Sequence, residues 1–258
     1  CKYVFHLAAL ADIVPSIEQP DKYFNTNVKG TLNILMASKK YNIKKVVYSA
    51  SASCYGVVKK FPTDEKNKIL TEYPYALTKY LGENLLAHWS KVYKISTISL
   101  RLFNVYGIRS RTTGAYGAMF GVFLAQKINN KPLTIVGSGN QSRDFTYVTD
   151  VVRAFYLASI TNIFHDIFNV GTGAPTTVNY VAKKLGGKKV FIPKRPGEPD
   201  KSQASIKKIS KKLKWKPNIS IDKGIKIMLS NIGDWKSAPA WTPQKIKIKT
   251  KTWFKYLK

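Results

Sequence analysis

The stretch between residues 45 and 56 joins a buried strand to a cluster of small hydroxyl side chains. It reads Lys45-Val46-Val47-Tyr48-Ser49-Ala50-Ser51-Ala52-Ser53-Cys54-Tyr55-Gly56. The apolar run over 45–49 predicts a strand, and Ser49, Ser51 and Ser53 follow at alternating positions. Open α/β sheets bind ligands at the carboxyl ends of parallel strands, so these hydroxyls lie where a substrate would bind. The simpler interpretation is that the serines only shape a turn.

Strands and helices alternate on both sides of this stretch. Hydrophobic patterning predicts strands over 4–9, 45–49 and 96–100, separated by helices over 21–41 and 75–92. This alternation is typical of right-handed crossovers and a parallel sheet, and therefore of an α/β fold.

Beyond Tyr106 the pattern becomes mixed α and β. A loop is predicted over 107–117, with helices over 119–129, 206–213 and 221–235 and strands over 133–136, 143–146, 167–170 and 189–193. This mixed pattern of helices and strands favours a smaller lobe that holds a substrate.

The net charge of +29 over 258 residues favours, at first sight, a Lys-rich domain that binds nucleic acid without catalysis. However, arginine, the usual bidentate ligand of phosphate and guanine, occurs only at 101, 109, 111, 143, 153 and 195. Lysines on solvated helix faces explain the charge more simply. We expect no nucleic-acid partner.

Other simple classes are also disfavoured. No run approaches the roughly 20 apolar residues of a membrane span, and we expect no membrane partner. The two cysteines, Cys1 and Cys54, make no disulfide framework, which favours a reducing cytoplasm. His6, His88 and His165 lack the spacing of metal ligands, and no metal site is expected.

Tyr75 and Lys79 are the first candidates for catalytic residues. Their i, i+4 spacing on the predicted helix over 75–92 puts both side chains on one face. An ammonium beside a phenol favours the phenolate and would lower the pKa of Tyr75 toward neutral pH. Taken alone, the pair could equally be a surface contact on a helix.

Several short segments, in order over about 200 residues, give the chain a resemblance to a known family. They are His6-Leu7-Ala8-Ala9, Asn25-Thr26-Asn27-Val28-Lys29-Gly30-Thr31, Ser51 through Gly56, Tyr75-x-x-x-Lys79, Arg101-Leu102-Phe103-Asn104-Val105-Tyr106-Gly107, Arg143-Asp144-Phe145-Thr146-Tyr147-Val148, Asn169-Val170-Gly171 and Arg195-Pro196-Gly197-Glu198. The chain resembles an extended short-chain dehydrogenase/reductase of the NAD-dependent nucleotide-sugar epimerase/dehydratase branch, similar to UDP-glucose 4-epimerases.

The resemblance implies a role for each matching residue. Tyr75 would be the acid/base on the sugar hydroxyl, Ser51 would hydrogen-bond the reacting oxygen, and Lys79 would hold the nicotinamide ribose. The implied NAD-binding positions are Leu7, Ala8, Ala9, Leu10, Ala11, Thr26, Tyr75, Lys79 and Phe103. The implied substrate-binding positions are Ser51, Asn104, Arg143, Arg195 and Ser202. For Arg143, a salt bridge to Asp144 or Asp150 is the alternative.

The reaction implied by the resemblance is NAD-dependent epimerisation at C4 of a nucleotide-diphosphate sugar, such as a UDP-sugar, through a 4-keto intermediate. A dehydratase would carry an Asp-Glu pair where Ala52 and Ser53 stand, and a decarboxylase a glutamate before the Val-Tyr-Gly tripeptide. These two activities and a reductase stay as alternatives. Ser202 matches the position that gates the sugar pocket, where a small residue admits N-acetylated sugars.

The resemblance also implies a domain organisation. Residues 1–106, with about 148–175, would form an incomplete dinucleotide-binding domain of Rossmann-like, doubly wound topology, and 107–147 with 176–258 the smaller mixed α/β substrate-binding lobe. The Gly-rich phosphate turn that opens such a domain is absent. We therefore expect a fragment whose first strands are missing, inactive alone, and a homodimer when full-length, formed through the helices over 21–41 and 75–92.

Overall fold

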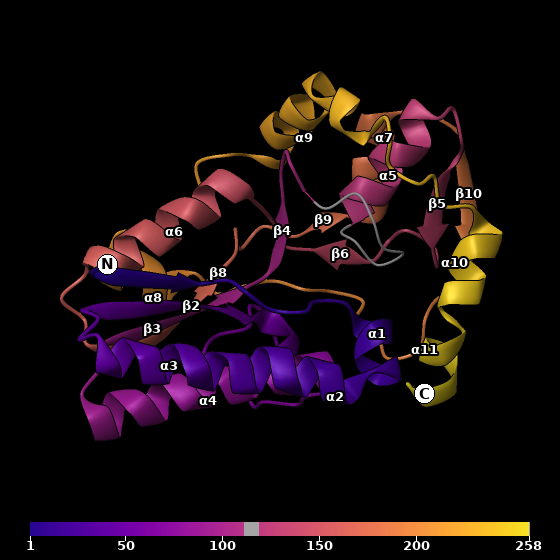
Figure 1. The fold of residues 1–258 in the computed structure, drawn as a ribbon. Helices are drawn as coiled ribbons and strands as arrows, with labels where there is room; N and C mark the ends of the chain where they lie inside the picture. The colour runs from indigo at the N-terminus through magenta and orange to yellow at the C-terminus, as the bar shows by residue number, and fades with distance from the viewer. Residues whose placement is uncertain (111–118, 258) are drawn as a thin grey trace.

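The computed structural model describes residues 1–110 and 119–257, so residues 111–117 of the predicted loop over 107–117 lie outside the described residues. Its centre is a parallel sheet in the order β1-β2-β3-β8 (Figure 1). The strands are β1 (Tyr3–His6), β2 (Lys45–Ser51), β3 (Thr97–Leu102) and β8 (His165–Val170). The predicted α/β fold with a parallel, Rossmann-like sheet is confirmed.

Strand β2 is buried on both faces because its alternate side chains enter two different cores. Val46, Tyr48 and Ala50 pack into one core with Leu35 of the neighbouring helix. Val47 packs into the other. Side chains alternate across a strand, and a parallel sheet covered on both faces therefore needs the near-continuous apolar run seen here.

Helices cover both faces of this sheet (Figure 1). The helices α3 (Gly30–Lys40) and α4 (Pro74–Tyr93) lie on one face, and α6 (Val148–Ile160) and α8 (Lys207–Leu213) lie on the other. Upstream of α3 the chain forms α1 (Ile13–Glu18), α2 (Pro20–Tyr23) and a π-helical segment (Phe24–Lys29). A short 3₁₀ turn (Ala52–Tyr55) follows β2 directly.

The second part of the chain is mixed α and β, as predicted. Its strands pair as β4 (Asn104–Tyr106) with β7 (Phe145–Tyr147), β5 (Leu133–Val136) with β10 (Lys189–Ile192), and β6 (Ser142–Arg143) with β9 (Thr176–Thr177). Its helices are α5 (Met119–Ile128), α7 (Val178–Leu185), α9 (Ile221–Ser230), α10 (Pro243–Lys249) and α11 (Lys251–Tyr256). Tyr106 stacks on Phe120 at 4.4 Å in a separate apolar core. The proposed domain boundary near residue 106 stays a prediction.

Some predicted elements differ in detail. The predicted helix over 21–41 is helical throughout 20–40 but contains the π-helical segment. The predicted strand over 143–146 is divided at Asp144, whose buried carboxylate accepts backbone N–H bonds from Thr172, Gly173 and Ala204. The predicted strand over 4–9 ends at His6, and the predicted helix over 221–235 ends at Ser230, where a 3₁₀ turn (Ile232–Trp235) follows.

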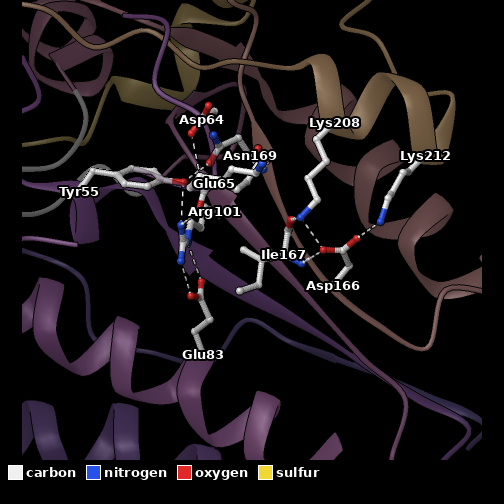
Figure 2. Close-up of polar contacts among 11 residues, drawn as sticks. Tyr55, Asp64, Glu65, Glu83, Arg101, Asp166, Ile167, Asn169, Lys208 and Lys212 are labelled. Carbon is white, nitrogen blue, oxygen red and sulfur yellow. Dashed lines mark hydrogen bonds and ion pairs between the residues drawn. The ribbon is translucent and has the colours of Figure 1, made fainter. Parts of the chain in front are cut away.

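A buried ion pair ties α4 to the sheet (Figure 2). Glu83 of α4 accepts two hydrogen bonds from the Arg101 guanidinium of β3, at 2.9 and 2.6 Å. Arg101 also donates to the Tyr55 hydroxyl at 2.8 Å, and Tyr55 donates to the Asn169 side chain at 2.7 Å. One network therefore connects α4, two strands and the turn after β2.

Loss of one partner from this pair should destabilise the protein. Glu83→Gln leaves the Arg101 charge buried without its carboxylate, and we expect a loss of about 3–5 kcal/mol in the free energy of unfolding. The control is Asp200→Asn, because Asp200 pairs with Lys194 on the surface and such pairs contribute about 1 kcal/mol or less. Urea denaturation of both variants measures the difference, and equal losses would contradict the structural role of the network.

Candidate active site

A cavity of about 480 Å³ opens beside the carboxyl ends of β2 and β3. The predicted site residues among its lining are Ala11, Ser51, Tyr75, Phe103, Asn104, Arg143, Arg195 and Ser202. These residues come from both the parallel-sheet part and the mixed α and β part of the chain, which meet at this cavity. Leu7, Ala8, Ala9, Leu10, Thr26 and Lys79 are not among the lining residues.

Ser51 is placed by the end of β2. Its hydroxyl lies 2.8 Å from the Ser53 hydroxyl and also accepts the Ser53 backbone N–H at 3.2 Å, which caps the 3₁₀ turn. The turn interpretation of these serines is therefore correct, yet both also line the cavity. The cap keeps the Ser51 hydroxyl at the cavity wall.

Tyr75 lies on the first turn of α4, and its side chain lines the same cavity as Ser51. Burial raises the pKa of the Tyr75 phenol, and the Ser51 hydroxyl opposes that rise. The expected lowering of this pKa by Lys79 is wrong, because desolvation of the phenolate outweighs the favourable contacts. The phenol is therefore protonated near neutral pH in this structure.

Lys79 lies one helical turn further along α4 and is buried. Its ammonium packs over the Tyr48 ring, 4.4 Å from the ring centroid, and burial lowers the pKa of Lys79 to about 7. The same cluster includes His6, whose pKa falls to about 4 through burial and through the Lys79 charge. The Lys79 amine is thus a buried group that changes charge near neutral pH.

The loop after β1 holds the residues expected to contact a dinucleotide. The Asn27 side chain accepts the Leu10 N–H at 2.7 Å and donates to the Leu10 carbonyl at 3.0 Å. Asn27 also donates to Thr78 of α4 at 3.0 Å, which links the loop to the helix of Tyr75 and Lys79. Thr26, its neighbour on the π-helical segment, points to the exterior and is exposed.

The opposite end of the cavity carries positive charge. Arg143 pairs with Glu198 at 2.9 Å, so neither of the expected alternatives, Asp144 or Asp150, is its partner. Arg195 lies 3.9 Å from the other Glu198 oxygen. Ser202 donates its backbone N–H to Ser142, beside Arg143, and this places it on the same wall.

Sequence reasoning assigned no role to Glu198 or Trp253, which also line the cavity. Glu198 lies between the two arginines, and Trp253 comes from α11. The Arg-Pro-Gly-Glu segment was a signal for Glu198. No local pattern identifies Trp253, because its contacts lie more than 50 residues away in the chain.

Over 1–110 and 119–257, the structure contains no group of three or more His, Cys, Asp or Glu side chains arranged to hold a metal ion. None of the helices in those same ranges has the length and apolar character needed to cross a bilayer.

The buried Lys79 predicts a specific pH dependence of stability. Between pH of about 7 and 10.5 the unfolded chain binds a proton at Lys79 that the folded chain does not, so stability should rise with pH across this window. Lys79→Met should remove that part of the rise, whereas Lys91→Met, at an exposed site of α4, should keep it. Urea denaturation across the window measures the slopes, and identical slopes in wild type and Lys79→Met would contradict the burial argument.

Comparison with known proteins places the chain in a family. The model of the NAD dependent epimerase/dehydratase family matches residues 1–171. A putative UDP-glucose 4-epimerase of Methanocaldococcus jannaschii is 37% identical over 230 residues, which cover 86% of this chain and 74% of that protein.

Two solved structures are similar over most of the chain. UDP-N-acetylglucosamine 4-epimerase from Methanobrevibacter ruminantium, in complex with UDP-N-acetylmuramic acid, matches with a TM-score of 0.84 and 31% identity over 89% of this chain and 77% of that one. UDP-glucuronic acid 4-epimerase from Bacillus cereus, in complex with UDP-glucuronic acid and NAD, matches with a TM-score of 0.82 and 30% identity over 90% of this chain and 75% of that one. The chain belongs to the NAD-dependent epimerase/dehydratase family and is related to the nucleotide-sugar 4-epimerases.

Proposed function

We propose that the protein catalyses NAD-dependent epimerisation at C4 of a nucleotide-diphosphate sugar through a 4-keto intermediate. The observation that carries the proposal is the arrangement of the cavity. The hydroxyl side chains of Ser51 and Tyr75 line this cavity, and Arg143 and Arg195 line it too. A sugar hydroxyl could therefore meet the first pair while a diphosphate meets the arginines.

Tyr75 is proposed as the acid/base and Ser51 as the group that orients the reacting oxygen. Burial raises the pKa of the phenol, so Tyr75 rests in its protonated form and must first release that proton to solvent before it can accept the proton of the C4 hydroxyl. The Ser51 hydroxyl favours the phenolate that this first transfer needs. The proton taken from the C4 hydroxyl is then returned by the phenol when the carbonyl is reduced.

The residues present fit the nicotinamide end of NAD. Leu7 is 59% exposed although apolar, and with Ala8 it follows the carboxyl end of β1, where α/β sheets bind dinucleotides. We propose that Leu7–Ala11, Thr26 and Phe103 line the cofactor and that Lys79 holds its ribose. When bound, NAD supplies the hydride acceptor and donor for C4. The chain's own contribution is to orient the sugar and to move the proton at the Tyr75 oxygen.

The anionic end of the substrate is assigned to the arginines. The planar guanidinium groups of Arg143 and Arg195 suit phosphate oxygens, and we propose that they bind the diphosphate, with Asn104 contacting the sugar nucleotide. Asn104 is exposed and lines the cavity. Ala52 and Ser53 carry no carboxyl group that could assist elimination of water, which supports epimerisation over dehydration.

A homodimer through α3 and α4 is also proposed. Met36 and Tyr41, on and just after α3, and Val92 and Tyr93 of α4 are exposed apolar side chains. A second copy would cover these residues, in keeping with the tendency of extended apolar surface to mark an interface.

Removal of the Tyr75 hydroxyl tests the proposed chemistry. In the purified protein, Tyr75→Phe should lower kcat by about 10²–10⁴-fold, the usual contribution of a positioned acid/base. Tyr73→Phe is the control, because the Tyr73 ring stacks with Tyr75 and lines the same cavity. Interconversion of UDP-glucose and UDP-galactose is the assay, and Tyr75→Phe with the wild-type kcat would refute the role.

The size of residue 202 should decide which sugars fit. Ser202 lines the cavity beside Arg143, and its small side chain leaves room for an N-acetyl group. Ser202→Tyr should therefore abolish turnover of UDP-N-acetylglucosamine and retain that of UDP-glucose, whereas Ser202→Ala should retain both. If wild type and Ser202→Tyr turned over UDP-N-acetylglucosamine and UDP-glucose in the same ratio, the proposed place of Ser202 in the sugar pocket would be wrong.

A further inference from the structure

The C-terminal helices cross from one part of the molecule to the other. In Figure 1, α10 lies beside β10, and α11 continues from it toward α1. The helix α11 contacts α1, and Thr252 donates to the Glu18 carboxylate at 2.7 Å. The end of the described chain is therefore packed against the segment that follows β1.

Trp253 is the buried residue of α11, and it joins this helix to the cavity. It is 3% exposed, and its indole N–H donates to the Pro196 carbonyl at 2.6 Å. The Arg195 guanidinium lies over its ring, 5.6 Å from the centroid. Trp253 and Ile246 of α10 both line the cavity, so both C-terminal helices contribute to its wall.

The contact with Trp253 limits where the positive charge of Arg195 can lie in the cavity. A guanidinium is attracted to the face of an aromatic ring within about 6 Å of the ring centroid, and its N–H groups can still meet oxygen acceptors. The hydrogen bond from the indole to Pro196 fixes the ring relative to the backbone next to Arg195. Trp253 therefore restricts the position of the Arg195 guanidinium.

We propose that Trp253 is a positioning residue that holds Arg195 toward the diphosphate of the nucleotide-sugar substrate. The inference rests on the proposed function, because it takes a diphosphate as the ligand of Arg195. It assigns a role in binding to a helix at the C-terminal end of the chain.

Binding of UDP and of uridine to the purified protein tests the proposal. Calorimetry for UDP and ligand-observed NMR for uridine would compare wild type with Trp253→Ala, Trp253→Phe and Phe254→Ala. Phe254 is the matched control, because it neighbours Trp253 on α11, is 42% exposed and is not among the lining residues. Trp253→Phe keeps an aromatic face and the packing, which guards against a variant that fails to fold.

We expect Trp253→Ala to weaken UDP binding about tenfold, which corresponds to about 1.4 kcal/mol, with uridine binding unchanged. Trp253→Phe should lie between wild type and Trp253→Ala, and Phe254→Ala should match wild type. Wild-type UDP affinity in Trp253→Ala, or equal losses for UDP and uridine, would overturn the positioning role alone. A wild-type protein that binds no UDP would instead overturn the proposed function, and this inference with it.

Discussion

The buried ion pair of Arg101 and Glu83 determines where the site residues lie. It holds α4 against β3, and the Arg101 bond to Tyr55 extends the same constraint to the turn that carries Ser51 and Ser53. Tyr75 lies on the first turn of α4, so Ser51 and Tyr75 can line one cavity only while both segments keep their places. A buried charge pair of this kind holds its geometry because each partner is costly to bury alone.

The cavity separates two chemical tasks by position. The first part of the chain supplies the hydroxyl groups of Ser51 and Tyr75, to which the proposed function assigns proton exchange with the sugar. The residues of the second part supply charge, with Glu198 between Arg143 and Arg195 and with Trp253 beneath Arg195. Substrate binding and proton transfer can therefore be altered by different substitutions, which makes the proposed roles separable by experiment.

Local patterning was sufficient for the parallel sheet and for placing Tyr75 and Lys79 on one helix, whereas the proposed roles of Ser51 and Tyr75 come from the resemblance to a family. The run over 45–49 and the helical spacing of Tyr75 and Lys79 reflect nearest-neighbour physics, which a single sequence contains. The helices α6 and α7, the partner of Arg143 and the position of Trp253 were not predicted. The ion pair and the indole contact depend on residues more than 50 positions apart, and the raised pKa of Tyr75 depends on burial that no spacing rule describes.

The central claim is that one sugar hydroxyl is held jointly by Ser51 and Tyr75 while the arginines bind the diphosphate. A crystal structure of the full-length protein with a bound UDP-sugar tests it most directly. The account predicts that the Ser51 and Tyr75 hydroxyls both lie within hydrogen-bond distance of the oxygen at C4, with Arg143 and Arg195 on the phosphates. A sugar bound outside this cavity, or a Tyr75 hydroxyl turned away from it, would contradict the account.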